Sequence, residues 1–257
     1  MKNKENTAST TQANECSLTQ AQFHALVHGF ETVMKFNPQK VYLKDSKLAV
    51  ALIFDDKPGP PYVRALIQAD YTSLLGQKVT IAFAADKAVI KKAKAIRGAG
   101  DIRVRLQDGQ YCIQGDHTAT HFPAIPMLEA SCFTLPTCTW LGVEVAGYDP
   151  KDISAYIGKV GKKGKAVHLA VYDDQLEQVW AEGQNAPYTF TAGMAERLAK
   201  RRPDVELLSQ VAFRFIGPNQ SLRIGKVNDQ YFLCATTPID MSVDLVVTER
   251  LDVVSGR

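Results

Sequence analysis

The 257-residue chain lacks the features that mark several functional classes. Its five cysteines are scattered and never spaced as CxxC, which argues against a disulfide framework or a structural zinc site and favours reduced thiols in a cytoplasm. No stretch approaches the ~18 consecutive apolar residues of a membrane-spanning helix. The polar segment 1–16 has no apolar run of the kind found in secretory signals, so we expect a disordered tail there.

An excess of charge of one sign is also missing, because 30 Lys and Arg residues against 27 Asp and Glu residues leave a net charge of only +3. Net charge therefore identifies no nucleic-acid partner, and the distribution of charge has to decide.

Recognisable catalytic and ligand-binding signatures are absent as well. The aspartate pairs at 55–56 and 173–174 fall in predicted turns, where Asp is favoured for local hydrogen bonds. Two HxxxH pairs, His24 with His28 and His117 with His121, have no third ligand at a recognisable spacing. The basic segment 158–165 lacks the GK[ST] ending of a phosphate-binding loop. We expect no catalytic residue, no metal site and no cofactor.

Positive charge is concentrated in one segment, DKAVIKKAKAIRGAG at residues 86–100. On a helical wheel Lys87, Lys91 and Lys94 fall within about 60° of one another. A different side gathers apolar residues for a core: Val89, Ile90, Ala93 and Ile96. Asp86 can cap the start of this helix, and Gly98 and Gly100 can end it in conformations that most residues avoid. The lysine stripe is either a solvated face or an anion-binding surface.

The order of predicted elements repeats along the chain. The first half contains a helix at 17–35, a hairpin at 40–54, strands at 63–69 and 79–83, the basic helix and a hairpin at 102–114. The second half contains a strand at 140–146, helices at 149–160 and 192–201, hairpins at 167–181 and 221–236, and a last strand at 242–248. A repeat of about 120 residues predicts two similar α+β domains with antiparallel sheets. The domains would span 17–122 and 139–257, with a Pro-rich linker at 123–138.

Three parts of the chain carry a family resemblance: VTIAFAADKAVIKKAKAI with IRVRLQDGQYCIQG, VEVAGYDPKDISAYIGKV before HLAVYDDQLEQVWAEG, and SLRIGKVNDQYFLCATTPIDMSVDLVV. They resemble the DNA sliding clamps, which are ring-shaped processivity factors of polymerases. In element order the resemblance covers most of residues 17–250. It implies antiparallel sheets outside, two helices per domain inside, and a homotrimeric ring for a subunit with two domains.

The resemblance also implies roles for particular residues. Basic residues on or near the inner helices would attract the phosphates of duplex DNA without reading its sequence. Besides Lys35, they are Lys87, Lys91, Lys94, Arg97, Lys159, Lys162, Lys163, Lys165, Lys200 and Arg201. A polymerase or another DNA enzyme would dock through a short peptide motif on Ile125, Met127, Leu128, Pro238 and Ile239. A clamp loader is a further candidate partner. Edge strands within 103–111 and 168–179 would close the ring.

Three features depart from the clamp pattern and leave open a clamp-like fold with a changed role, such as an accessory clamp of a mobile element or a partner-binding derivative. We find no clear strand before the first helix, the chain is slightly basic where clamps are often acidic, and the first helix carries His24 and His28 in place of positive charge. A separate alternative to a clamp ring is an α+β enzyme or a monomeric binding domain whose lysines serve only solubility. The number of subunits distinguishes the two.

Overall fold

The computed structural model describes residues 15–53, 63–98, 100–127, 139–140, 167–171, 179–183, 186–189, 205–211, 221–240 and 242–256. The first half contains β1 (Glu15–Leu18), α1 (Gln20–Val33), η1 (Met34–Phe36), β2 (Lys40–Lys44), β3 (Lys47–Ile53), β4 (Val63–Asp70), α2 (Thr72–Leu75), β5 (Ile81–Ala84), α3 (Lys87–Lys94), β6 (Ile102–Gln107), β7 (Gln110–Gln114) and β8 (Ala119–Pro123). The second half contains β9 (Thr139–Trp140), β10 (Val167–Val171), β11 (Val179–Gly183), β12 (Ala186–Thr189), β13 (Val205–Ser209), β14 (Ser221–Val227), β15 (Gln230–Asp240), β16 (Val243–Arg250) and β17 (Asp252–Gly256). The helices predicted at 149–160 and 192–201 lie outside the described residues.

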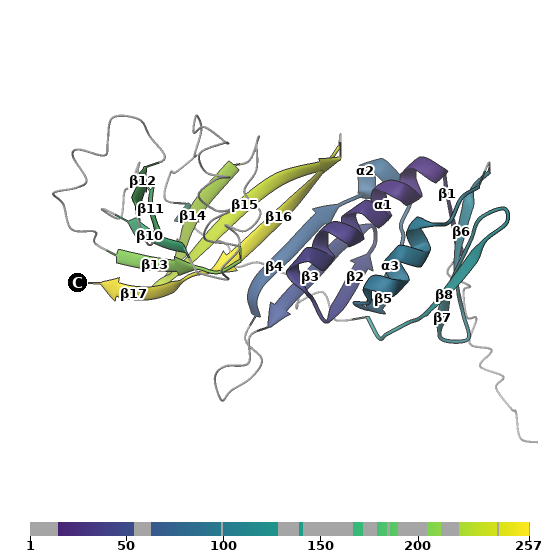
Figure 1. Cartoon of the computed structure of the whole chain (residues 1–257), viewed down its shortest axis with the longest axis horizontal. Helices are drawn as coiled ribbons and strands as arrows, with labels where there is room; N and C mark the ends of the chain where they lie inside the picture. Colours follow the sequence, from purple (N-terminus) through teal and green to yellow (C-terminus); the bar gives the residue numbers. More distant parts are fainter. Residues whose placement is uncertain are drawn as a thin grey trace, which may run out of the picture.

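The strands form three sheets, and every described pairing between strands is antiparallel. A four-stranded sheet has the order β1-β6-β7-β8, and a five-stranded sheet has the order β12-β11-β10-β13-β17. The largest sheet has eight strands in the order β5-β2-β3-β4-β16-β15-β14-β9. It therefore crosses from one half of the chain to the other where β4 pairs with β16 (Figure 1). The predicted α+β class with antiparallel sheets is confirmed.

The two halves repeat the same strand order. In the first half, β1-β6-β7-β8 form one sheet and β5-β2-β3-β4 are neighbours in another. Counted from β9, the same positions in the second half give β9-β14-β15-β16 and β13-β10-β11-β12. The strand order thus supports the duplication that the sequence predicts, and β17 is one strand more than we expected after residue 248.

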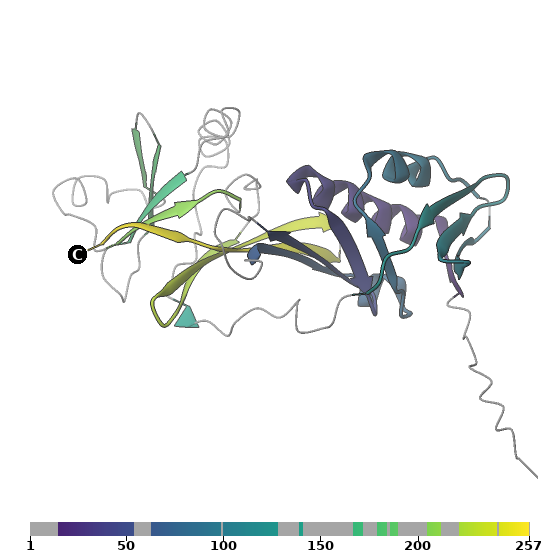
Figure 2. The same ribbon diagram turned by 90° about the horizontal axis from the view of Figure 1, so that it is seen from below.

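Helices α1 and α3 lie side by side over one face of β2, β3 and β5 (Figures 1 and 2). Their apolar sides and that face of the sheet form one buried core. Within it, the ring of Phe83 on β5 meets Phe30 of α1 and Phe122 of β8, each with ring centroids 5.2 Å apart. This packing holds the two helices in place on the sheet and directs their polar sides away from it.

Turn residues explain the hairpins of the first half. Asp45 and Ser46 join β2 to β3 with φ of 49° and 66°, and Asp108 and Gly109 join β6 to β7 with φ of 52° and 71°. Two positive φ values in succession match the twist of a tight hairpin, and Asp, Ser and Gly tolerate or favour that conformation. Both hairpins were predicted at these residues.

The start of α1 differs from the prediction. Glu15 and Cys16 belong to β1, which pairs with β6, so the expected tail of residues 1–16 extends too far and the strand that we missed before the first helix is present. Four residues with a single strongly apolar side chain give too weak a pattern to predict a strand. The helix begins after Thr19, not at Ser17, because Thr19 and Gln22 form a reciprocal capping box.

Two further expectations were wrong. Helix α3 ends at Lys94 with Ala95 in a right-handed conformation, and neither Gly98 nor Gly100 has the left-handed conformation expected of them. The segments proposed as ring-closing edges, 103–111 and 168–179, contain interior strands: β6 lies between β1 and β7, and β10 lies between β11 and β13. The edge positions depended on which distant strands pair, and local sequence does not contain that information.

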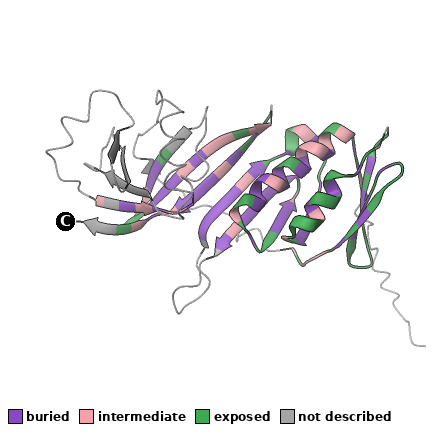
Figure 3. Cartoon of the chain, viewed as in Figure 1, coloured by how far each residue is buried: buried purple, intermediate pink, exposed green. Residues whose placement is uncertain are grey.

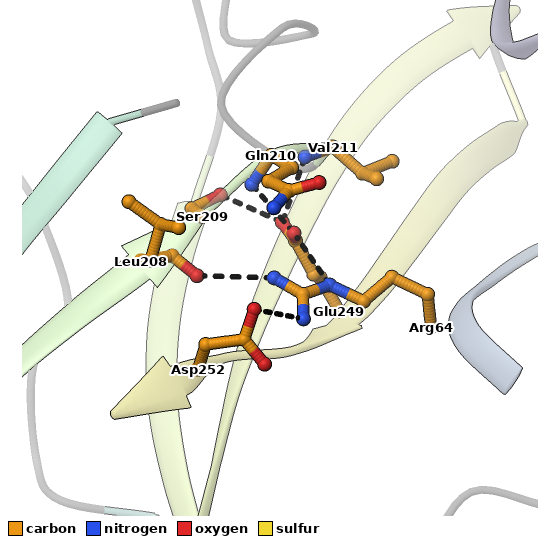
Figure 4. Close-up of polar contacts among 7 residues, drawn as sticks. All are labelled: Arg64, Leu208, Ser209, Gln210, Val211, Glu249 and Asp252. Carbon is orange, nitrogen blue, oxygen red and sulfur yellow. Dashed lines mark hydrogen bonds and ion pairs between the residues drawn. The ribbon is translucent and has the colours of Figure 1, made fainter. Parts of the chain in front are cut away.

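A buried polar network joins the halves beside the β4–β16 pairing (Figure 4). The carboxylate of Glu249, fully buried, accepts hydrogen bonds from Ser209 Oγ at 2.6 Å and from the backbone N–H groups of Gln210 and Val211 at 2.6 and 3.0 Å. Arg64 of β4 contacts Glu249 at 3.4 Å and Asp252 at 2.6 Å, and donates to the backbone oxygen of Leu208 at 3.3 Å. Every partner of Arg64 here comes from the second half of the chain.

Among the described residues, no helix combines the length and apolar character needed to cross a membrane.

Candidate functional site

Helix α3 carries the main cluster of positive charge. Asp86 caps its start by accepting a hydrogen bond from the N–H of Ala88 at 2.7 Å. Ile90, Ala93 and the following Ile96 are buried, as predicted from the helical wheel, and they anchor the helix on the core. Lysines in its last turn also interact favourably with the negative end of the helix dipole.

The exposed side of α3 presents four lysines, Lys87, Lys91, Lys92 and Lys94 (Figure 3). Lys92 was missed, because the stripe at i, i+4 and i+7 excludes it although it is exposed. Lys94 is already paired: its Nζ lies 3.0 and 2.9 Å from the two carboxylate oxygens of Glu31 on α1. Within the described part of the chain, no acidic side chain forms an ion pair with Lys87, Lys91 or Lys92. These three form the free cationic surface of α3.

Arg97 makes contacts that the sequence did not predict. It follows the helix, and its Nη1 donates to the backbone oxygen of Lys94 at 2.6 Å and lies 3.1 Å from His24 Nε2 on α1. Gln20 of α1 completes the contact by accepting from the N–H of Gly98 at 2.8 Å. These groups join the end of α3 to the start of α1, and the role of Arg97 in DNA binding stays a prediction.

The remaining predicted DNA contacts are placed as follows. Lys35 is exposed in η1, directly after α1. The other candidates lie outside the described residues: Lys159, Lys162, Lys163, Lys165, Lys200 and Arg201.

A second feature, the sheet pocket, lies over β2, β3, β4 and β16 and has a volume of about 750 Å³. Two rows of side chains cross these strands in register. The inner row is Tyr42, Ala49, Gln68 and Val246. The charged row is Lys44, Lys47, Asp70 and Asp244. Ala49 is small and stands between Tyr42 and Gln68, so the inner row is lowest at that point.

The charged row is positive at its β2 end and negative at its β16 end. Lys44 and Lys47 lie on β2 and β3, Asp70 and Asp244 lie on β4 and β16, and Lys47 meets Asp70 at 3.8 Å. Hydrogen bonds from Thr72 hold the pKa of the Asp70 carboxyl below its usual value, and Lys47 adds to that effect. The carboxylate is therefore charged at neutral pH.

The structure does not bring the predicted peptide-binding residues together. Ile125 donates its backbone N–H to Ala82 of β5 at 3.0 Å, whereas Pro238 and Ile239 lie on β15. Four strands separate β5 from β15 in the sheet, a distance of roughly 24 Å at about 4.8 Å per strand. Met127 is half-buried and Leu128 lies outside the described residues. The sheet pocket, formed by residues that the sequence did not single out, lies between the two groups.

The part of the chain that the structure describes contains no cluster of three or more His, Cys, Asp or Glu side chains that could hold a metal ion.

Neither a scan of protein-family models nor a search of curated proteins finds a match to this sequence. A search of solved structures does. The beta chain of DNA polymerase III from Streptococcus pneumoniae has a TM-score of 0.57 at 10% identity over 98% of this chain and 67% of that one. The chain has the fold of a DNA sliding clamp. PCNA of A. fulgidus, bound to the C-terminal region of FEN-1, has a TM-score of 0.51 at 10% identity over 94% of this chain and 99% of that chain.

The match covers a smaller share of the bacterial beta clamp chains than of the PCNA chain. The beta clamp of Helicobacter pylori in complex with 5-chloroisatin has a TM-score of 0.52 at 9% identity, over 95% of this chain but only 64% of that one. The chain thus spans about two thirds of the bacterial clamp chains and nearly all of the PCNA chain. Its length corresponds to the PCNA type of clamp subunit.

Proposed function

We propose that the chain is a non-enzymatic sliding clamp that forms a homotrimeric ring around duplex DNA and tethers a polymerase or another DNA enzyme. The observation that carries this proposal is the free cationic surface of α3, formed by the exposed Lys87, Lys91 and Lys92, whereas Ile90 and Ala93 of the same helix are buried. Such a surface attracts phosphates without reading bases, and weak, exchangeable contacts allow sliding. The cytoplasmic location expected from the cysteines stays a prediction.

The repeated strand order suggests how copies would join. Inside one chain, β4, the fourth strand of the first half, pairs with β16, the eighth strand of the second half. The corresponding strands are β12 and β8, and among the described strands each has only one partner, β11 and β7 respectively. Pairing β8 of one copy with β12 of the next would repeat the internal junction and use both free edges.

Three copies would bring six domains into the ring. This number follows from the resemblance to two-domain clamps and from the length shared with the PCNA chain. The domains proposed are 17–122 and 139–257 with the linker 123–138, the first extended to Glu15 by β1.

The sheet pocket is the proposed site for a client peptide. It lies where the two halves of the chain share one sheet, and its volume of about 750 Å³ falls within the range of ligand pockets. A clamp among the structural neighbours holds the C-terminal region of FEN-1, and others hold small molecules, which supports a peptide-binding role on this fold.

The decisive test is whether the protein stays on circular DNA but leaves linear DNA. The purified protein is assembled on nicked circular DNA and on linear DNA of the same length, and its mass in solution is measured by light scattering. We expect a trimer, and retention on the circle that is lost when the circle is cut. A strict monomer at micromolar concentration, or equal release from both DNAs, would refute the ring.

A further inference from the structure

The charged row of the sheet pocket runs from positive to negative across four strands. Lys44 on β2 and Asp244 on β16 are its ends, and Lys47 and Asp70 pair with each other between them at 3.8 Å. Among the described residues, neither Lys44 nor Asp244 takes part in an ion pair. The ends of the row therefore offer one unpaired charge of each sign to a bound molecule.

The distance between the two ends limits what can satisfy both. Neighbouring strands lie about 4.8 Å apart, so three spacings place the backbones of Lys44 and Asp244 roughly 14 Å apart. An extended peptide rises about 3.3 Å per residue, so two of its residues about four positions apart span that distance.

The inner row supplies an apolar floor beside these charges. Tyr42 and Ala49 are 3% and 6% exposed and are partners in register on β2 and β3, and Val246 ends the row beyond Gln68. An apolar or aromatic side chain placed above Ala49 would fill the lowest part of the pocket, and its burial would provide most of the binding energy.

We propose that the sheet pocket takes a peptide with an acidic and a basic residue about four positions apart and an apolar residue between them. The acidic side chain pairs with Lys44, the basic side chain with Asp244, and the apolar side chain sits over Ala49. The peptide thus lies across the strands in one orientation, set by the two charges. This inference rests on the proposed role of the pocket in client binding.

A random peptide library panned on the full chain tests the proposal. We expect enriched peptides to carry opposite charges about four positions apart around an apolar residue. The variant K44E/D244K should bind these peptides at least about tenfold more weakly and should bind their charge-swapped versions instead, since two pairs become two repulsions. The variant R105E, which changes an exposed residue of β6 outside the pocket, should bind the original peptides normally.

The outcomes separate the inference from the proposed function. Enriched peptides that compete at the pocket but bind K44E/D244K unchanged would overturn the charge assignment and leave client binding intact. Enrichment of no peptide at all would overturn it as well. The variant A49W, which fills the pocket floor, should abolish peptide binding, and its thermal unfolding is compared with that of the unchanged chain. Ring formation on DNA is measured separately, so a chain that forms no ring is distinguished from a chain whose pocket binds no peptide.

Discussion

Arg64 and Glu249, 185 residues apart in the sequence, meet in a buried contact of 3.4 Å that joins the two halves of the chain. Arg64 is 5% exposed and Glu249 is not exposed at all, so neither charge can turn to water when its partner is removed. The pair lies beside the strand pairing by which the eight-stranded sheet crosses between halves. The junction within the chain is thus held by charges as well as by backbone hydrogen bonds.

Replacing Glu249 by Ala should lower the free energy of unfolding by about 3–5 kcal/mol, because Arg64 stays buried with only one of its two carboxylate partners and the backbone N–H groups of Gln210 and Val211 lose their acceptor. Urea unfolding followed by circular dichroism measures the change. The matched control is Lys47→Ala, which breaks an ion pair whose side chains are 68% and 59% exposed and should cost no more than about 1 kcal/mol. Equal losses in the two variants would contradict the structural role of the network.

Gly29 of α1 should not tolerate a methyl group. A Cβ atom at this position would lie 1.8 Å from the hydroxyl oxygen of Tyr71, whose side chain is fully buried. Gly→Ala in an open helix normally stabilises by about 0.5–1 kcal/mol, but we expect Gly29→Ala to destabilise by about 1–3 kcal/mol. Denaturant unfolding gives the sign directly.

The double variant with Tyr71→Phe isolates that clash. In the described part of the chain the Tyr71 hydroxyl has no hydrogen-bond partner, so Phe at this position alone should change stability little. Combined with Gly29→Ala it should restore part of the lost stability, since the atom at 1.8 Å is gone while ring atoms remain near. Strictly additive effects would show that the two residues are not in contact.

Changing Lys87, Lys91 and Lys92 together to Ala should weaken binding to duplex DNA and make it less dependent on salt. The slope of log K against log salt should fall by about 1 for each lysine that contacts a phosphate. Fluorescence anisotropy at several salt concentrations provides the slope. The control removes Arg103 and Arg105, which are exposed on β6 and alternate with buried Ile102 and Val104. If both variants reduce the slope equally, α3 has no special role.

The variant Glu31→Gln should have the opposite effect and strengthen the binding of DNA to α3. It releases Lys94, whose Nζ lies 2.9 Å from the Glu31 carboxylate, and removes a negative charge from the helix pair. We expect DNA binding to strengthen by a few-fold and the salt slope to steepen. Unchanged binding would indicate that Lys94 does not reach the phosphates.

Cys16 should be slow to alkylate in the folded protein. Burial, and to a lesser degree the charge of Glu15, raises the pKa of its thiol from 9.0 to about 11. At pH 8 its thiolate fraction is then about 100-fold below that of an exposed thiol, and mass spectrometry after iodoacetamide treatment measures the rate. Because the unfolded chain loses this proton first, the thiol's contribution to stability should decrease as the pH rises from about 9 to 11. Fast labelling of the native protein would contradict the partial burial of Cys16 in β1.

Local sequence was sufficient for several elements of this fold. Asp86 as the capping residue predicted the start of α3, and the helical spacing of apolar residues such as Ile90 predicted its buried side. The Asp45-Ser46 and Asp108-Gly109 turns predicted two hairpins. Each of these depends on residues within a few positions of one another, so the sequence contains the whole physical cause.

Only the tertiary structure determined how those elements pair and which of their side chains come into contact. Strand β1, the β4–β16 pairing and the contact of Arg64 with Glu249 depend on partners more than 80 residues away. The sheet pocket exists because β16 of the second half joins β2, β3 and β4 of the first half in one sheet, and Glu31 neutralises Lys94 only because α1 lies against α3. The sequence alone determines where charged and apolar residues lie along each helix and strand. Long-range packing determines which charged side chains are neutralised by an ion-pair partner and which remain free.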